Sequence, residues 1–186
     1  PIYPFIISIS MGFGKFLSVS YHFIQKFIQI FFLFLTQILT LKILRKLKVG
    51  NILTSLCILY LGFSPALVNS ALSLYSEIVT YPIMLTIILL SCKAWQSFQT
   101  SWKKPVVLGF LCGLAFIAIT FVKGIFEIIV PIYFMTYAFF AMRSLIKKNI
   151  KLFINSIVFL STLLLTFYIP LTMYKFLNKK YNGNFA

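Results

Sequence analysis

The chain has 186 residues, of which 61% are hydrophobic and 10% are charged, whereas soluble domains have roughly 45–50% apolar and about 25% charged residues. This composition excludes a soluble globular fold. There are 17 Lys and Arg residues and two acidic residues, both of them Glu. Because the chain has no Asp, one His and three scattered Cys, it cannot by itself supply a Ser-His-Asp triad, an Asp-rich calcium loop or a zinc site.

Six uncharged runs follow one another along the chain. Because a charged side chain in hydrocarbon is costly, such runs mark candidate membrane spans. The runs cover residues 27–41, 49–76, 78–92, 105–122, 128–142 and 152–174. The shorter ones approach the roughly 20 residues that a spanning helix needs once the stems of flanking Lys and Arg are included. The sequence therefore predicts an all-α fold, a polytopic transmembrane helical bundle with about six spans in residues 22–174.

Neither end of the chain is long enough to add a span. Pro1 and Pro4 predict an extended start, and few residues precede Lys15, so we expect residues 1–21 to form an outer interfacial segment. Residues 175–186 are expected to form an outer C-terminal segment. Because the chain begins without Met or a leader and ends without a terminal signal, we expect residues 1–186 to be a fragment of a single transmembrane domain, cut at both ends.

Proline and glycine predict two features inside the bundle. Pro65 cannot continue a regular helix, so the second span is expected to end near it, with an outer connection running to Glu77. Gly109 and Gly113 lie one helical turn apart, which allows another helix backbone to approach closely. The fourth span is therefore predicted to pack tightly on a neighbouring helix.

The loops between six alternating spans fall into two sets, and the set richer in Lys and Arg faces the cytoplasm. The richer set contains Lys42, Arg45, Lys46, Lys48, Lys93, Lys103, Lys104, Arg143, Lys147, Lys148 and Lys151. The poorer set contains Lys15, Lys26, Lys123, Lys175, Lys179 and Lys180. Both Glu residues are therefore predicted on the outer side. Since the basic residues punctuate helices and form no single face, we expect the lipid bilayer as a partner and no nucleic acid.

Four residues near the outer side are candidate substrate-binding residues: Glu77, Lys123, Glu127 and His22. A lone acid at the edge of a span is costly unless it is paired or wetted. Lys123 and Glu127 stand four residues apart and can pair with each other if the helix continues. Glu77 has no local cation, and Lys123 is its alternative partner if the helices bring it close. His22 can either contact a phosphate or anchor in the headgroups.

A series of short motifs runs along the chain. They are Pro1-Ile2-Tyr3-Pro4, Phe13-Gly14, Leu44-Arg45-Lys46-Leu47, Pro65, Ser76-Glu77, the Gly-x-x-x-Gly-Leu-Ala of residues 109–115, and Pro170 with the tail of residues 181–185. In this order they resemble the GT-C membrane glycosyltransferases, among them bacterial protein mannosyltransferase relatives and lipid A aminoarabinose transferases. The chain departs where that family has Thr-Arg, since Thr120 and Lys123 stand nearby instead, and the Trp and Arg of the family's C-terminal pattern are absent.

The resemblance implies an enzyme that moves a sugar from a polyprenyl-phosphate donor to a protein, lipid or glycan acceptor on the outer face of the bacterial inner membrane. The family's catalytic and metal-binding acids lie in the first outer loop, which would precede Pro1. The catalytic residues of this protein are therefore unknown, and the fragment alone is expected to be inactive and to hold no cofactor. A divalent metal stays open for the full-length protein. Lys123, and more weakly His22, would stabilise charge on the leaving phosphate, and Glu77 would hold a sugar hydroxyl or orient the catalytic loop.

Two other classes of function stay open. A polytopic transporter would place polar residues near mid-span, facing a cavity. A noncatalytic subunit of a membrane assembly is compatible with the composition and with the spans, but it gives no reason for the ordered motifs.

Overall fold

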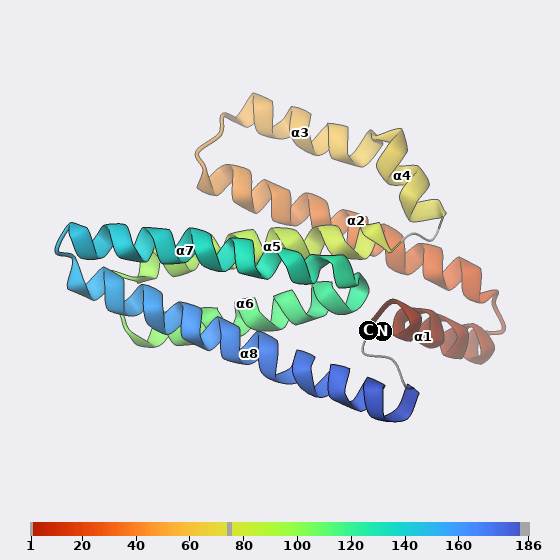
Figure 1. Ribbon diagram of the computed structural model, residues 1–186. Coiled ribbons are helices and arrows are strands. Elements are labelled where there is room, and N and C mark those ends of the chain that lie inside the picture. The colour runs from red at the N-terminus through yellow and green to blue at the C-terminus, as the bar shows by residue number, and fades with distance from the viewer. Residues whose placement is uncertain (1, 74–75, 183–186) are drawn as a thin grey trace. The chain divides into compact units, whose positions relative to one another are not determined.

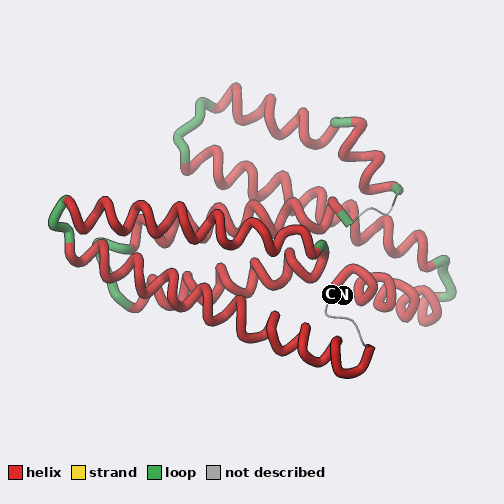
Figure 2. Tube along the Cα trace, viewed as in Figure 1, coloured by secondary structure: helices red, strands yellow, loops and turns green. Residues whose placement is uncertain are grey.

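A computed structural model describes residues 2–73 and 76–182 of the chain (Figure 1). These residues form helices joined by short turns, and no strand occurs among them (Figure 2). The elements are α1 (Ile2–Leu17), α2 (Tyr21–Lys46), α3 (Asn51–Phe63), α4 (Pro65–Leu72), α5 (Glu77–Ser97), α6 (Lys103–Val122), the 3-10 helix η1 (Gly124–Ile128), α7 (Ile129–Ile146) and α8 (Ile150–Asn182). The predicted all-α fold is confirmed.

Five stretches in the described part of the chain are long and apolar enough to cross a membrane: α2, α5, α6, η1 with α7, and α8. A sixth is added if α3 and α4, which meet at a bend of 41°, count as one span. Each uncharged run of the sequence falls on one of these six. The protein is thus an all-α polytopic bundle, as the spacing of its charges predicts.

The helices extend beyond the uncharged runs that predicted them. Lys26 lies inside α2, and Lys93 lies inside α5. Arg45 and Lys46 occupy the last turn of α2, where their charge is favourable at the negative end of the helix dipole. α8 likewise continues past Lys175 to Asn182, so the predicted outer C-terminal segment is helical in its described part.

The structure corrects the predicted extended start of the chain. α1 already includes Pro4, which stands in the first helical turn, where its missing N–H has no helical partner to lose; Pro1 lies outside the described residues. α1 packs against α2, and the side-chain nitrogens of Gln25 and Gln29 each donate a hydrogen bond of 3.2 Å to the Tyr3 hydroxyl. Burial raises the pKa of this hydroxyl, while the two hydrogen bonds oppose the rise. With 16 residues, α1 is short for a span, and its interfacial position stays a prediction.

Pro65 ends a helix, as predicted. α3 stops at Phe63, Ser64 adopts an extended conformation, and Pro65 is the first residue of α4. Proline suits this position because its fixed φ matches the helix and its missing N–H is not needed there. The connection toward Glu77 is therefore largely helical.

The contacts divide the chain into two units, residues 1–86 with 121–123, and residues 87–120 with 124–186. In the first unit, Leu33 of α2, Ala71 of α4 and Ile78 of α5 form a buried cluster. In the second, aromatic rings fill the interior, where Phe98 contacts Phe159 with ring centroids 5.7 Å apart. Each unit thus has apolar packing of its own.

The predicted close packing at Gly109 and Gly113 is confirmed in the second unit. A Cβ atom placed on Gly109 would lie 2.6 Å from the backbone oxygen of Phe159, and one on Gly113 would lie 2.9 Å from that of Leu163. Both glycines are buried against α8. The two helices can approach this closely only because neither glycine carries a side chain.

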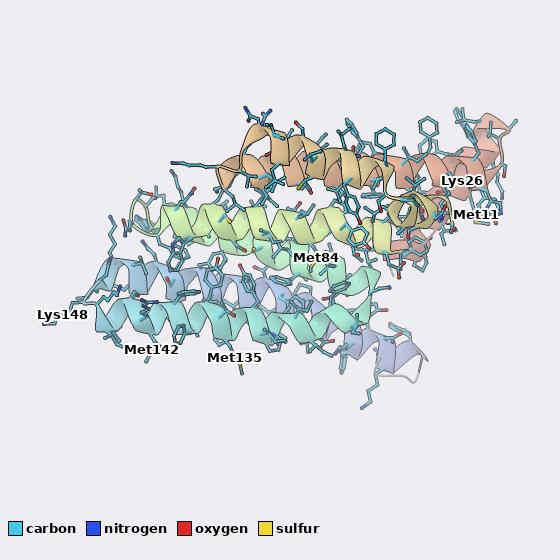
Figure 3. All side chains as sticks on the ribbon, turned by 90° about the horizontal axis from the view of Figure 1, so that it is seen from above. Met11, Lys26, Met84, Met135, Met142 and Lys148 are labelled. Atoms are coloured by element: carbon cyan, nitrogen blue, oxygen red, sulfur yellow. The ribbon has the colours of Figure 1, made fainter. Side chains whose placement is uncertain are left out.

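Large apolar side chains also cover the outside of this unit. Met135 and Met142 point outward from α7 (Figure 3), with 70% and 56% of their surfaces exposed. Lys148 lies at the turn between α7 and α8. An apolar belt that ends at charged turns is the surface that a bilayer requires.

Candidate ion-pair site at the ends of the spans

Glu77 and Lys123 form an ion pair in the first unit. Glu77 is the first residue of α5, Lys123 follows the last residue of α6, and the Lys123 ammonium donates a hydrogen bond to Oε1 of Glu77. About two-fifths of each side chain is exposed, 40% for Glu77 and 38% for Lys123. The pairing of Lys123 with Glu77, which the sequence left open, is thus confirmed.

The alternative pairing of Lys123 with Glu127 is wrong. It required the helix to continue, but α6 ends at Val122 and the chain then forms the 3-10 helix η1. Gly124 follows Lys123 directly, and glycine is the residue most often found just past the end of a helix. This signal was present in the sequence and predicts the break.

Local electrostatics favour both members of the pair. The carboxylate of Glu77 lies at the positive end of the α5 dipole, and the ammonium of Lys123 lies at the negative end of the α6 dipole. The turn between the two helices spans only residues 98–102. Because the free ends of α5 and α6 meet in this pair, the two helices form an antiparallel hairpin that the ion pair closes.

Glu127 pairs with a residue that sequence reasoning did not select. Lys175 of α8 donates hydrogen bonds of 2.8 Å to both carboxylate oxygens of Glu127. The exposed fractions are 29% for Lys175 and 36% for Glu127. Lys175 belongs to the predicted outer set of basic residues, so the sequence restricted the partner to few candidates. It could not choose among them, because the pair joins positions 48 residues apart.

We expect the Glu127–Lys175 pair to contribute little to stability. Replacing Glu127 with Gln should lower the free energy of unfolding by no more than about 1 kcal/mol, because partly exposed ion pairs are screened by water and ions. Thermal unfolding in detergent at low and high salt measures the effect. A loss of several kcal/mol, unchanged by salt, would contradict this expectation.

The structure does not gather all four candidate residues into one constellation. It joins Glu77 to Lys123, and it gives Glu127 a separate partner. His22 is exposed, and its ring lies 3.9 Å from that of Tyr21. In residues 2–73 and 76–182, no three His, Cys, Asp or Glu side chains lie close enough to hold a metal ion.

Sequence reasoning also missed a polar cluster in the interior of the second unit. The Ser91 and Tyr133 hydroxyls lie 2.6 Å apart, and the Tyr137 hydroxyl donates to the backbone oxygen of Ser91 at 3.1 Å. The sulfur of Cys112 lies 3.8 Å from the Tyr133 hydroxyl. These contacts tie α5, α6 and α7 together. No local sequence pattern predicts these contacts, because the partners come from three helices.

No protein-family model, curated protein or solved structure matches this chain. Its function is therefore inferred from its own residues and their geometry.

Proposed function

We propose that the chain is the scaffold portion of a GT-C-type membrane glycosyltransferase, which moves a sugar from a polyprenyl-phosphate donor to a protein, lipid or glycan acceptor on the outer face of the bacterial inner membrane. One observation carries the proposal. Ser76-Glu77 is a motif of the resemblance, Lys123 is the cation near the place where the family has Thr-Arg, and Glu77 and Lys123 meet in an ion pair. The pair holds an ammonium beside the acidic residue of that motif, at the end of the spans that the resemblance assigns to the outer face.

The chemistry of sugar transfer gives Lys123 a role. The acceptor attacks the anomeric carbon while the phosphate leaves, so a cation held near the departing oxygen stabilises the charge that develops there. A lysine ammonium has three N–H donors, of which one is bound to Glu77. The other two can reach a phosphate, while the carboxylate of Glu77 holds the ammonium at the end of the hairpin.

The scaffold does not supply every group that the reaction needs. A general base must take the proton of the acceptor, and the resemblance assigns this role to acids in a segment before Pro1. Glu77 is therefore a positioning residue for Lys123 in this proposal, or a hydrogen-bond acceptor for a sugar hydroxyl. A divalent metal, if the full-length protein uses one, would bind to that same preceding segment.

A transporter is the second candidate, and the polar cluster around Tyr133 is the observation that favours it, because transporters place polar groups near mid-span. The hydroxyls of this cluster, however, are used in bonds between helices and to the backbone. They act as links in the packing of the unit.

Reconstitution of the full-length protein in vesicles separates the candidates. We expect transfer of radiolabelled sugar from a polyprenyl phosphate to an acceptor, and we expect Glu77→Gln to lower this transfer about tenfold or more by releasing Lys123. Expression and topology should not change. Energised uptake of a solute without sugar transfer would favour the transporter, and neither activity would favour a noncatalytic subunit. Wild-type transfer by Glu77→Gln would leave the ion pair a purely structural role.

A further inference from the structure

The basic residues of this chain greatly outnumber the groups that can neutralise them. The chain has 17 Lys and Arg residues and two acidic residues, and both acids are already paired, with Lys123 and with Lys175. The formal net charge is therefore +15. Anions that balance this excess must come from outside the chain.

Three of these cations gather around one pocket in the second unit. The pocket has a volume of about 590 Å³ and lies at the turn between α5 and α6, where its polar lining comes from Lys93, Gln96, Ser97, Thr100, Lys103 and Lys104. All three lysines belong to the basic set that the positive-inside rule places in the cytoplasm. Val107 and Leu108 form an apolar wall on the α6 side. The site thus offers positive charge and hydroxyl and amide groups next to an aliphatic surface.

The position of two of the lysines is unfavourable without an anion. Lys103 and Lys104 are the first two residues of α6, and the first turn of this helix contains no acidic residue. Cations at the positive end of a helix dipole destabilise the helix, whereas anions there are stabilised. A bound phosphate would reverse the sign of this local interaction, because it would face both the dipole and the ammonium groups.

The turn that carries the pocket is held in place. Asn155 of α8, which is 3% exposed, donates a hydrogen bond of 2.5 Å to the backbone oxygen of Phe98. The buried hydroxyl of Ser97 bonds the backbone oxygen of Ala94, and the backbone N–H groups of Thr100 and Ser101 both bond that of Ser97. The lysines therefore extend from a fixed frame.

Trp102 marks the depth of the site in the membrane. Its side chain is 67% exposed, and the ammonium of Lys103 lies 5.7 Å from the centre of its ring. Exposed Trp side chains at the ends of spans settle at the level of the lipid headgroups. The pocket should thus lie where the phosphates of the inner leaflet lie.

We propose that the pocket at the α5–α6 turn binds the phosphate of an anionic glycerophospholipid of the cytoplasmic leaflet. Lys93, Lys103 and Lys104 surround the phosphate, Thr100 and Gln96 offer hydrogen bonds, and Val107 and Leu108 contact the start of an acyl chain. Basic pockets between helices on the cytoplasmic side are suited to such headgroups. The positive-inside rule predicts this site on the cytoplasmic side, whereas the sugar transfer is proposed on the outer side, so the two proposals do not depend on each other.

Quenching of Trp102 fluorescence by brominated lipids tests the site. The chain has two Trp residues, and Trp95→Phe leaves Trp102 as the reporter while keeping an aromatic ring beside Phe98 and Phe140. In vesicles of phosphatidylcholine, we expect brominated phosphatidylglycerol to bind near Trp102 about tenfold more tightly than brominated phosphatidylcholine. The triple variant K93Q/K103Q/K104Q should bring the two lipids to within about twofold of each other.

Two further triple variants and added inorganic phosphate serve as controls for this test. K42Q/K46Q/K48Q removes the same charge from the C-terminal end of α2 and the turn that follows it. This variant should keep the preference, and K93R/K103R/K104R should keep it as well. Equal loss in the two glutamine variants would overturn the proposal in favour of diffuse surface charge. If the two brominated lipids quenched Trp102 equally, and millimolar inorganic phosphate protected Trp102 from quenching in vesicles of phosphatidylcholine alone, the ligand would be a soluble anion. This result would overturn the proposal.

Discussion

Replacing Lys123 with Ala in the full-length protein is expected to lower kcat/KM for the polyprenyl-phosphate-linked donor by about a hundred- to a thousandfold, the range expected when one hydrogen-bond donor to a developing anion is lost. The loss should appear with the lipid-linked donor and should not depend on the acceptor, because in the proposed mechanism the ammonium acts on the leaving phosphate. Initial rates at varied donor and acceptor concentrations measure both dependences.

A matched control is available in the second ion pair. Lys175→Ala breaks a Glu–Lys pair of similar exposure but removes no residue that the resemblance selects, so the donor kinetics should stay close to those of the wild type. The charge exchange E77K/K123E keeps an ion pair at the hairpin end while moving the ammonium to α5. It should restore stability only in part, because each exchanged charge then lies at the unfavourable end of its helix dipole, and it should not restore transfer. Donor kinetics unchanged by Lys123→Ala would remove this residue from the site.

Much of the fold could be predicted because its determinants are local. Charges are excluded from hydrocarbon, so the uncharged runs located the spans, and Pro65 located a helix end, since proline cannot continue a helical ladder. Gly109 and Gly113 predicted a close approach because their spacing alone puts both on one face. None of these inferences needs knowledge of a distant partner.

The failures have physical causes of two kinds. The predicted extended start at Pro4 is wrong, because proline breaks a helix in its interior but is accommodated in the first turn. The partner of Glu127 and the cluster around Tyr133 depend on which helices become neighbours, and no local spacing determines that. The pairing of Glu77 with Lys123 could be predicted only as one of two alternatives for Lys123. The end of α6 before Gly124 excludes the other, Glu127.

The close packing of α6 on α8 leads to the largest expected effect on stability. A methyl group on Gly109 would meet a backbone oxygen, that of Phe159, at 2.6 Å, and a backbone atom cannot move aside as the end of a flexible side chain can. Gly109→Ala should therefore lower the free energy of unfolding by about 1–3 kcal/mol, the usual cost of overpacking. Alanine is otherwise the better helix former by about 1 kcal/mol, so the clash must also offset that gain.

A second glycine of the chain serves as the control for this loss of stability. Gly12 lies in α1, and a Cβ atom placed on it would have nothing within 4 Å; Gly12→Ala should therefore leave the melting temperature in detergent unchanged or raise it slightly. Gly109→Ala should lower it by several degrees, and G109A/G113A should lower it further, because Gly113 faces the backbone oxygen of Leu163 at 2.9 Å. If Gly109→Ala melted at or above the wild-type temperature, α6 and α8 would be packed less tightly than the structure has them.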